Sequence, residues 1–382
     1  VKSCSPCTFR YGVTESLEYL QSSNVYTRDD EFIDSEEHHV VVTTAARYAY
    51  DYLMPYEEII CDHHWDYVII DEASMMDIVT MVFILYKSHD CQFIISGDPK
   101  QIQPVRQNEI QPENIYQMVG LNSFAAAQKN PQVECLNIQY RSIPTIGELV
   151  SEFSYNGLVK PNRTQDSQKK LNLGFKISSI NFVGFKTELL DNLYGLDSID
   201  ESAFHLYSAI FGYEYAGYIA QRIADEKPKE PYSIGIVCPY KKQADCIKQM
   251  IELRDISNDV CMISCGTVHS FQGDECDIMI VVLNPPMNVG QNAHVNNQNI
   301  INVAMSRAKD YIFFLVPDNR TPGFTTREVL GKMANDKSIM FCNDIEQIMF
   351  GQSDYIQQHT NVTCHMPVNI YYEPSSFYEV RK

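Results

Sequence analysis

The sequence predicts an α/β protein with two domains, each built around a parallel β-sheet. Short apolar segments alternate with amphipathic segments along most of the chain, and polar residues follow nearly every apolar segment. The length of 382 residues is enough for two or three domains, and a hydrophobic content of 45% is enough for a large core.

The first series of elements runs from residue 38 to residue 98. HHVVVTT (38–44) ends a predicted strand at two threonines, and a helical pattern follows over 45–53. The strand WDYVIID (65–71) is followed by helical spacing over 74–87 and by the strand CQFIISGD (91–98). Polar residues at the end of each strand are the layout expected of a doubly wound parallel sheet.

A second series begins after about residue 135. Its predicted elements are a helix over 143–155, a strand over 232–240, a helix over 241–253, a strand over 277–284, a helix over 299–309 and a strand over 311–317. We therefore predict a first domain over 1–135 and a second over 136–320. Within the second, we expect the segment 160–205 to be a polar excursion, and residues 321–382 to be a C-terminal extension.

Two adjacent carboxylates, Asp71 and Glu72, follow the apolar run YVII. They should lie at the C-terminal end of a buried parallel strand, where α/β sheets place their ligands. Carboxylates in that position usually hold a metal ion or a reacting water. One helix and one strand later, GDPKQIQP (97–104) places Gln101 where its amide can contact a terminal phosphate, although this stretch alone is equally typical of a surface turn.

Further polar residues stand beside the predicted elements of the second domain. Arg141 precedes a helix near the domain boundary, where an arginine can stabilise charge that develops in phosphoryl transfer. Arg307 stands near a helix end, where capping of the helix by a cation is the simpler explanation. CGTVHSFQGDECD (265–277) supplies small polar side chains and a glycine, which let backbone amides approach phosphates or sugars.

Six stretches in order, DEAS, GDPKQIQP, QYRS, PYKKQ, GTVHSFQGDECD and NVAMSRAK, resemble motifs II to VI of superfamily 1 helicases, most closely the upframeshift-type subgroup. The resemblance covers residues 40–317 and is specific, because all six keep the family's order at compatible spacings. It implies two RecA-like domains, with ATP in the cleft between them and single-stranded DNA or RNA across both. It also implies that ATP hydrolysis drives movement along that strand.

The resemblance implies a role for each matching residue. Asp71 would hold Mg²⁺ through water, Glu72 would polarise the attacking water, and Gln101 would sense the γ-phosphate. Arg141 and Arg307 would act as two arginine fingers. Residues expected to bind the nucleotide are Asp98, Tyr140 (stacked on the adenine), Gly273 and Glu275. Residues expected to touch nucleic acid are Thr43, Thr44, Pro239, Tyr240, Thr267 and His269.

The net charge of −19, from 49 acidic and 30 basic residues, would repel a polyanion at long range. Binding of nucleic acid must therefore be confined to a groove of backbone amides, hydroxyls, rings and a few bases. No apolar run approaches the ~18 residues that span a bilayer, and no signal-peptide pattern is present. We expect a cytoplasmic monomer, or a nuclear one in a eukaryote, that does not bind membranes.

The family's phosphate loop, G-x-x-x-x-G-K-[ST], has no counterpart in the sequence. The only Gly-Lys pair, Gly331-Lys332, is followed by Met333 and lacks the upstream glycine. We therefore expect a C-terminal fragment whose missing N-terminal part holds the loop. The first RecA-like domain would then be truncated at its N-terminus, and the fragment would hydrolyse ATP weakly or not at all.

Two rival functions are a nucleotide-dead adaptor for nucleic acid or protein, and an ATPase switch that acts on a protein partner. Retention of Asp71, Glu72, Gln101, Arg141 and Arg307 argues against the adaptor, because an adaptor does not need all five. Threonines at strand ends favour a nucleic-acid strand only modestly over a protein partner.

A zinc site is a weaker hypothesis. Cys4 and Cys7 have the spacing of half a zinc site, and CDHH (61–64) offers the other half. The gap between the halves is long, and an exposed cysteine pair beside a polar turn is the simpler explanation.

Overall fold

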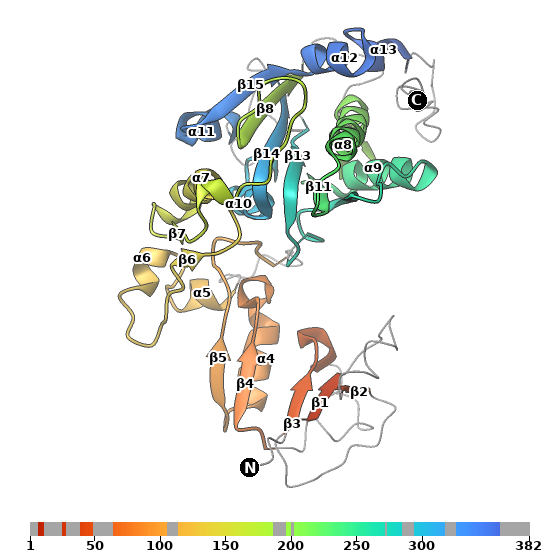
Figure 1. Ribbon diagram of the computed structural model, residues 1–382. Coiled ribbons are helices and arrows are strands. Elements are labelled where there is room, and N and C mark those ends of the chain that lie inside the picture. Colours follow the sequence, from red (N-terminus) through yellow and green to blue (C-terminus); the bar gives the residue numbers. More distant parts are fainter. Residues whose placement is uncertain are drawn as a thin grey trace. The chain divides into compact units, whose positions relative to one another are not determined.

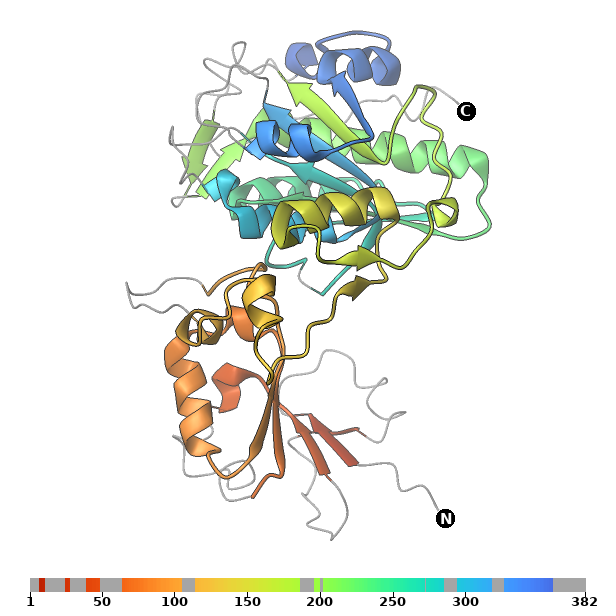
Figure 2. The same ribbon diagram turned by 90° about the vertical axis from the view of Figure 1, so that its left-hand side faces the viewer.

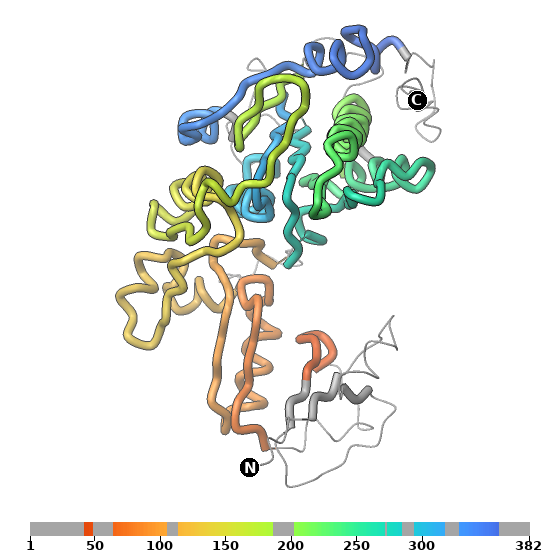
Figure 3. Tube along the Cα trace, in the orientation of Figure 1, coloured from red at the N-terminus to blue at the C-terminus, as the bar shows by residue number. Residues whose placement is uncertain are grey.

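The computed structural model divides into two compact units. The first consists of residues 1–99 and 103–122, and the second of residues 100–102 and 123–382. Figure 1 labels their elements, Figure 2 gives the view at right angles, and Figure 3 traces the chain. The structure describes residues 7–10, 25–27, 39–48, 64–104, 114–185, 196–199, 202–271, 273–284, 294–317 and 326–359.

The first unit contains two sets of parallel strands. Strands β1 (Cys7–Arg10), β2 (Val25–Thr27) and β3 (His39–Val42) form one sheet in the order β2-β1-β3. Strands β4 (Tyr67–Ile70) and β5 (Gln92–Ile95) form the other. A small core of Ile70, Ala73, Met81, Ile84 and Ile115 forms where β4 meets its following helix and α5 (Ile115–Met118).

The helix expected over 74–87 is split in the structure. A 3₁₀ turn, η1 (Ala73–Met75), is followed by α4 (Ile78–Lys87). Asp77 causes the later start because its carboxylate accepts a hydrogen bond from the Thr80 backbone N–H at 2.9 Å, which caps the new helix. The helix that begins at residue 45 is described only as far as residue 48.

The second unit is built on a six-stranded sheet whose strands all run parallel, in the order β12-β11-β13-β14-β8-β15. The strands are β8 (Ile180–Phe185), β11 (Tyr232–Cys238), β12 (Cys261–Thr267), β13 (Cys276–Val282), β14 (Ala308–Pro317) and β15 (Lys337–Phe341). Every residue of β13 is buried, as expected of a central parallel strand covered on both faces. The α/β fold class predicted from the sequence is confirmed.

Helices cover both faces of this sheet (Figures 1 and 2). Helices α8 (Leu206–Glu226) and α9 (Lys241–Leu253) pack together on one face, and α7 (Pro144–Tyr155) and α10 (Gln298–Ser306) pack together on the other. Helix α11 (Thr326–Met333) lies against α7, while α12 (Cys342–Phe350) and α13 (Tyr355–His359) lie near β15 and α8. Shorter elements of this unit are α6 (Phe124–Ala127), β6 (Ile138–Gln139), β7 (Lys160–Pro161), η2 (Gln165–Ser167), β9 (Leu196–Ile199), β10 (Ser202–His205) and η3 (His294–Asn296).

The segment expected to be a polar excursion contains a core strand, so that prediction is wrong over part of its length. All six residues of β8 are buried between β14 and β15. The polar Asn181 obscured this strand in the sequence. Its amide is satisfied inside the sheet, because it donates to the carbonyls of Ser178 at 2.7 Å and Ile312 at 3.2 Å.

The predicted domain limits differ from the structure at both ends of the second unit. The first unit ends at Asn122 rather than residue 135, because the ring of Phe124 in α6 packs edge-on against Tyr155 of the second unit at 6.4 Å. The predicted C-terminal extension supplies β15 to the sheet, and its residues Cys342 and Ile345 belong to the buried core. No helix among the described residues is long and apolar enough to cross a membrane.

Candidate nucleotide and nucleic-acid sites

Asp71 and Glu72 lie where β4 ends, beside the end of β5. The Ser96 hydroxyl donates to the Asp71 carboxylate, and Asp71 also accepts the Glu72 backbone N–H at 2.9 Å. The Ala73 N–H donates to the Ser96 carbonyl at 3.0 Å, which holds the two strand ends together. Glu72 takes a left-handed conformation with φ of 51°, which is uncommon for a residue other than glycine and is found at functional turns.

Gly97 allows the chain after β5 to pass close to this turn. A Cβ atom at residue 97 would lie 2.9 Å from the Ala73 nitrogen and 2.9 Å from the Tyr116 hydroxyl, and φ is +151°. Burial raises the pKa of Tyr116 to about 12, and the negative charges of Asp98, Glu72 and Asp71 add to this effect. The three carboxylates therefore create a negative potential at the C-terminal ends of β4 and β5, which favours a cation.

Gln101 and Arg307 meet within the second unit, although they stand far apart in the sequence. Arg307 caps the C-terminus of α10 and is 3% exposed. Its Nη2 donates to the Gln101 side-chain oxygen at 3.2 Å. Asn302, on the same helix, donates to the Lys100 carbonyl at 2.8 Å and to the Tyr155 hydroxyl at 2.9 Å. Asn302 thus holds the Lys100 backbone against α10, and Arg307 contacts the side chain of the next residue, Gln101.

Arg141 pairs with Glu275, and Lys309 pairs with the same carboxylate. Arg141 Nε lies 2.8 Å from Glu275 Oε2, and Lys309 Nζ lies 2.7 Å from Oε1. The hydrogen bond from Lys309 and the smaller effect of Arg141 lower the pKa of Glu275 despite partial burial. Tyr140, beside this group, is 67% exposed, and its ring is therefore accessible to a stacking partner.

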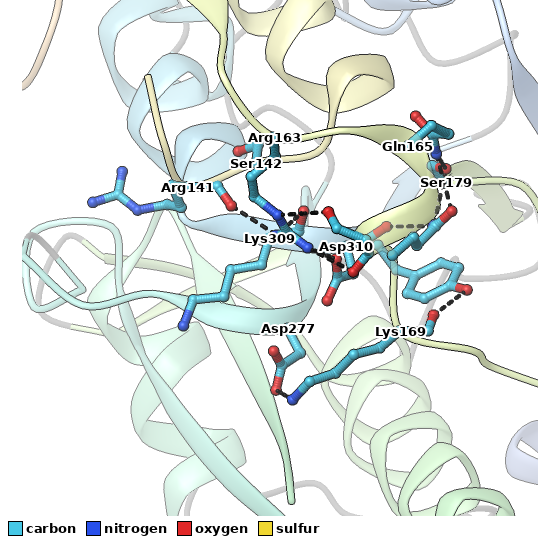
Figure 4. A network of polar contacts seen from close by, with 12 residues as sticks. Arg141, Ser142, Arg163, Gln165, Lys169, Ser179, Asp277, Lys309 and Asp310 are labelled. Atoms are coloured by element: carbon cyan, nitrogen blue, oxygen red, sulfur yellow. Dashed lines mark hydrogen bonds and ion pairs between the residues drawn. The ribbon is translucent and has the colours of Figure 1, made fainter. Parts of the chain in front are cut away.

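A second layer of polar contacts lies behind this cluster (Figure 4). Arg163 pairs with Asp310 at 2.8 Å, and Lys169 pairs with Asp277 at 3.0 Å. The carboxylates are on the second residue of β13 and the third residue of β14, and both cations come from the segment between α7 and β8. These contacts fasten that segment to the amino ends of β13 and β14.

Four of the residues predicted to touch nucleic acid lie at or just beyond the C-terminal ends of β11 and β12. Pro239 and Tyr240 follow β11, whereas Thr267 ends β12 and His269 follows it. Because β11 and β12 are neighbours, the fold brings the two pairs to one edge of the sheet. Burial and the nearby His294 lower the pKa of His269, so its imidazole is neutral at neutral pH.

The two predicted threonines belong to the first unit. Thr44 accepts the Arg47 backbone N–H at 3.2 Å and so caps the short helical turn after β3. The Thr43 hydroxyl is buried and has no hydrogen-bond partner among the described residues. Gly273, also predicted to bind the nucleotide, is exposed and has a φ of 92°, a conformation that suits glycine.

Sequence reasoning missed several members of these sites. His294 lies against the Tyr240 ring at 5.1 Å and contacts the Pro239 carbonyl at 3.2 Å. Lys309 is the last residue of the stretch NVAMSRAK, so its charge was visible in the sequence, but its pairing with Glu275 was not. Ser96 carries no sequence signal beyond its place at a strand end.

A metal site is not formed by the described residues alone, among which no three His, Cys, Asp or Glu side chains converge. Of the residues in the zinc hypothesis, Cys4, Cys61 and His63 lie outside the described residues, and Cys7 is described only by its backbone, in β1. His64 is described and is exposed. All eight cysteines whose side chains are described are free thiols.

Comparison with known proteins gives matches over most of the described chain. Residues 120–318 match the family model described as an AAA domain. The chain is 26% identical over 310 residues to the mov-10-B.1 protein of Danio rerio, which covers 67% of this chain and 29% of that protein. It is 26% identical over 281 residues to the DNA replication ATP-dependent helicase/nuclease dna2 of Schizosaccharomyces pombe, which covers 66% of this chain and 18% of that protein.

The chain spans less than a third of the length of these curated relatives. Among solved structures, the arterivirus nonstructural protein 10 (helicase) aligns with 87% of this chain and 56% of its own, at 12% identity and a TM-score of 0.38.

Proposed function

We propose that this chain hydrolyses ATP to move along single-stranded DNA or RNA. The chain belongs to the AAA-domain family matched by its residues 120–318 and is a superfamily 1 helicase. Asp71 and Glu72 in the first unit, and Gln101, Arg141 and Arg307 in the second, would take part in ATP hydrolysis. In this function the chain would belong to the upframeshift-type subgroup. It would also need a phosphate loop from outside these 382 residues.

The observation that carries the proposal is the contact between Arg307 and Gln101. The motifs assign one residue as an arginine finger and the other as the γ-phosphate sensor, from stretches 206 positions apart. A surface arginine would have no reason to be buried beside that particular amide. The contact supports assigning the two residues to a phosphate-sensing pair.

The carboxylates supply the other half of the chemistry. Asp71 is an oxygen ligand suited to Mg²⁺, and magnesium commonly keeps several waters and binds through one or two carboxylates and the substrate phosphates. This preference fits a site in which no third protein carboxylate, histidine or cysteine converges among the described residues. When bound, Mg²⁺ would neutralise charge on the transferred phosphoryl group. Glu72, on the adjacent strained turn, would orient the attacking water.

The proposal is tested by ATP hydrolysis and strand displacement in the full-length protein, with Glu72→Gln as the inactive control. We expect hydrolysis that depends on magnesium and is stimulated by single-stranded nucleic acid, and we expect the control to lose at least about 100-fold in kcat. Hydrolysis without strand displacement would favour an ATPase switch. Nucleic-acid binding without any hydrolysis would favour the adaptor.

A further inference from the structure

We propose that Arg163 is a positioning residue that holds Arg141 and Lys309 in place for ATP hydrolysis, an inference that rests on the proposed function. Arg163 lies in none of the motifs, and its side chain makes no contact with the predicted catalytic side chains. It acts on their backbone instead.

The Arg163 guanidinium joins two distant parts of the chain. Its Nη1 donates to the carbonyl of Arg141 at 2.8 Å and to that of Lys309 at 3.3 Å. Its Nη2 donates to Asp310 Oδ1 at 2.8 Å and to the Ser167 carbonyl at 3.0 Å. One planar group therefore sets the distance between the backbones of the two cationic residues.

Two further hydrogen bonds beside Arg163 join the same two segments of the chain. The Ile143 N–H donates to the Lys309 carbonyl at 3.0 Å, and the Ser142 hydroxyl donates to the Ala308 carbonyl at 2.6 Å. In Figure 4 the side chains of Arg141 and Lys309 point away from the Arg163–Asp310 pair, toward the same side. There they hold Glu275 between them. A shift of Arg163 would therefore move both cations relative to that carboxylate.

A buried ion pair by itself adds little to the free energy of unfolding. The Arg163–Asp310 pair is therefore better explained by the positions that it gives to the neighbouring residues. The Asp310 side chain is 2% exposed. Desolvation at this depth usually cancels much of the attraction between the charges, so an apolar pair would stabilise the fold about equally well. An apolar pair could not donate to the carbonyls of Arg141 and Lys309.

The neighbouring pair Lys169–Asp277 provides a matched control. Lys169 and Arg163 are similarly exposed, at 24% and 21%, and each faces a carboxylate that is nearly buried. Lys169 also donates to the Pro231 carbonyl at 2.7 Å, but makes no contact with residues 141 or 309. Replacing either cation by methionine leaves a buried carboxylate without its partner. Only Arg163→Met also removes the hydrogen bond to the Arg141 carbonyl.

The test measures steady-state ATP hydrolysis in the full-length protein with single-stranded nucleic acid. We expect Arg163→Met to lower kcat by about 10- to 100-fold, because small misplacements of catalytic groups have effects of this size, while KM for ATP changes by less than about twofold. Lys169→Met should lower the melting temperature to a similar degree and leave kcat within about twofold. In an Arg141→Ala background, Arg163→Met should lower kcat little further.

Arg163→Lys keeps a cation for Asp310 but lacks the planar fork, so we expect a nearly normal melting temperature and a reduced kcat. Normal kcat in this folded variant would overturn the inference, as would an equal loss of kcat in Lys169→Met or full additivity with Arg141→Ala. If Arg141→Ala itself leaves kcat unchanged, the proposed role of Arg141 fails. If that variant is impaired and the Arg163 variants are not, only the inference fails.

Discussion

His205 shows how one buried side chain links a helix start to the pH dependence of stability. It caps α8, with Nδ1 accepting the Ser208 backbone N–H at 3.3 Å, and its ring stacks on Phe185 at 5.1 Å. Burial lowers its pKa from 6.5 to about 3. The folded protein therefore holds this histidine neutral under conditions in which the unfolded chain would protonate it.

The lowered pKa predicts a loss of stability in mild acid. Between the unfolded pKa of 6.5 and the folded value of about 3, the unfolded state binds more protons, so the free energy of unfolding falls as pH falls below 6.5. This one group should contribute a loss of about 1 kcal/mol at a pH one unit below the unfolded value. Urea denaturation on either side of pH 6.5 measures the effect.

His205→Asn is the matched control, because asparagine keeps an oxygen acceptor for the helix start and does not titrate. Its stability should change less with pH than that of the wild type. If both proteins show the same pH dependence, His205 is not the group responsible.

At the level of single elements, β8 connects the edge strand β15 to the rest of the sheet in the second unit. It joins β14 to β15, and Phe182 stacks on Phe314 of the neighbouring strand at 5.2 Å. Phe182 is 3% exposed, whereas Phe341 at the end of the edge strand β15 is 47% exposed. The same residue type therefore occupies a core position and an edge position in one sheet.

We expect Phe182→Ala to lower the free energy of unfolding by about 3–5 kcal/mol, because it removes a buried ring and leaves a cavity. Phe341→Ala should lower it by less than about 2 kcal/mol, since its ring is already half in water. Chemical denaturation of both variants provides the comparison. Equal losses would contradict the placement of β8 in the core.

At the scale of the whole molecule, charge determines how nucleic acid could be bound. The net charge is −19, and none of the residues proposed to touch the strand is a lysine or an arginine. Few counterions would then be released on binding. Contacts from hydroxyls and rings such as Tyr240 would have to supply most of the affinity.

This charge balance predicts a weak salt dependence. With three or fewer neutralised phosphates, the slope of log K against log salt concentration for a single strand should be about −2 or shallower. Fluorescence anisotropy with a labelled single-stranded oligonucleotide measures the slope. Tyr240→Ala should weaken binding by a similar factor at each salt concentration, because stacking is not ionic. A much steeper slope would point instead to a basic groove that the proposed residues do not include.

Local sequence patterns predict the alternation of strands and helices and the positions of the polar strand ends. Central parallel strands are mostly apolar, so the strand predicted over 277–284, which forms β13 (Cys276–Val282), was recognisable without a structure. The carboxylates Asp71 and Glu72 were likewise identifiable, because they directly follow the apolar run YVII. The prediction that this strand is buried is wrong over most of its length, because among the described strands β4 pairs only with β5, and Ile70 is its one buried residue. Local patterns of this kind need no knowledge of distant residues.

Contacts between residues that are distant in the sequence depend on the folded chain. The Gln101–Arg307 contact, the sharing of Glu275 by Arg141 and Lys309, and the hold of Arg163 on both cations join separate segments of the chain. The place of β8 in the core also depended on partners that satisfy Asn181 inside the sheet. Hydrogen bonds and ion pairs act over a few ångströms in space, whatever the separation in sequence, and local patterns therefore do not encode them.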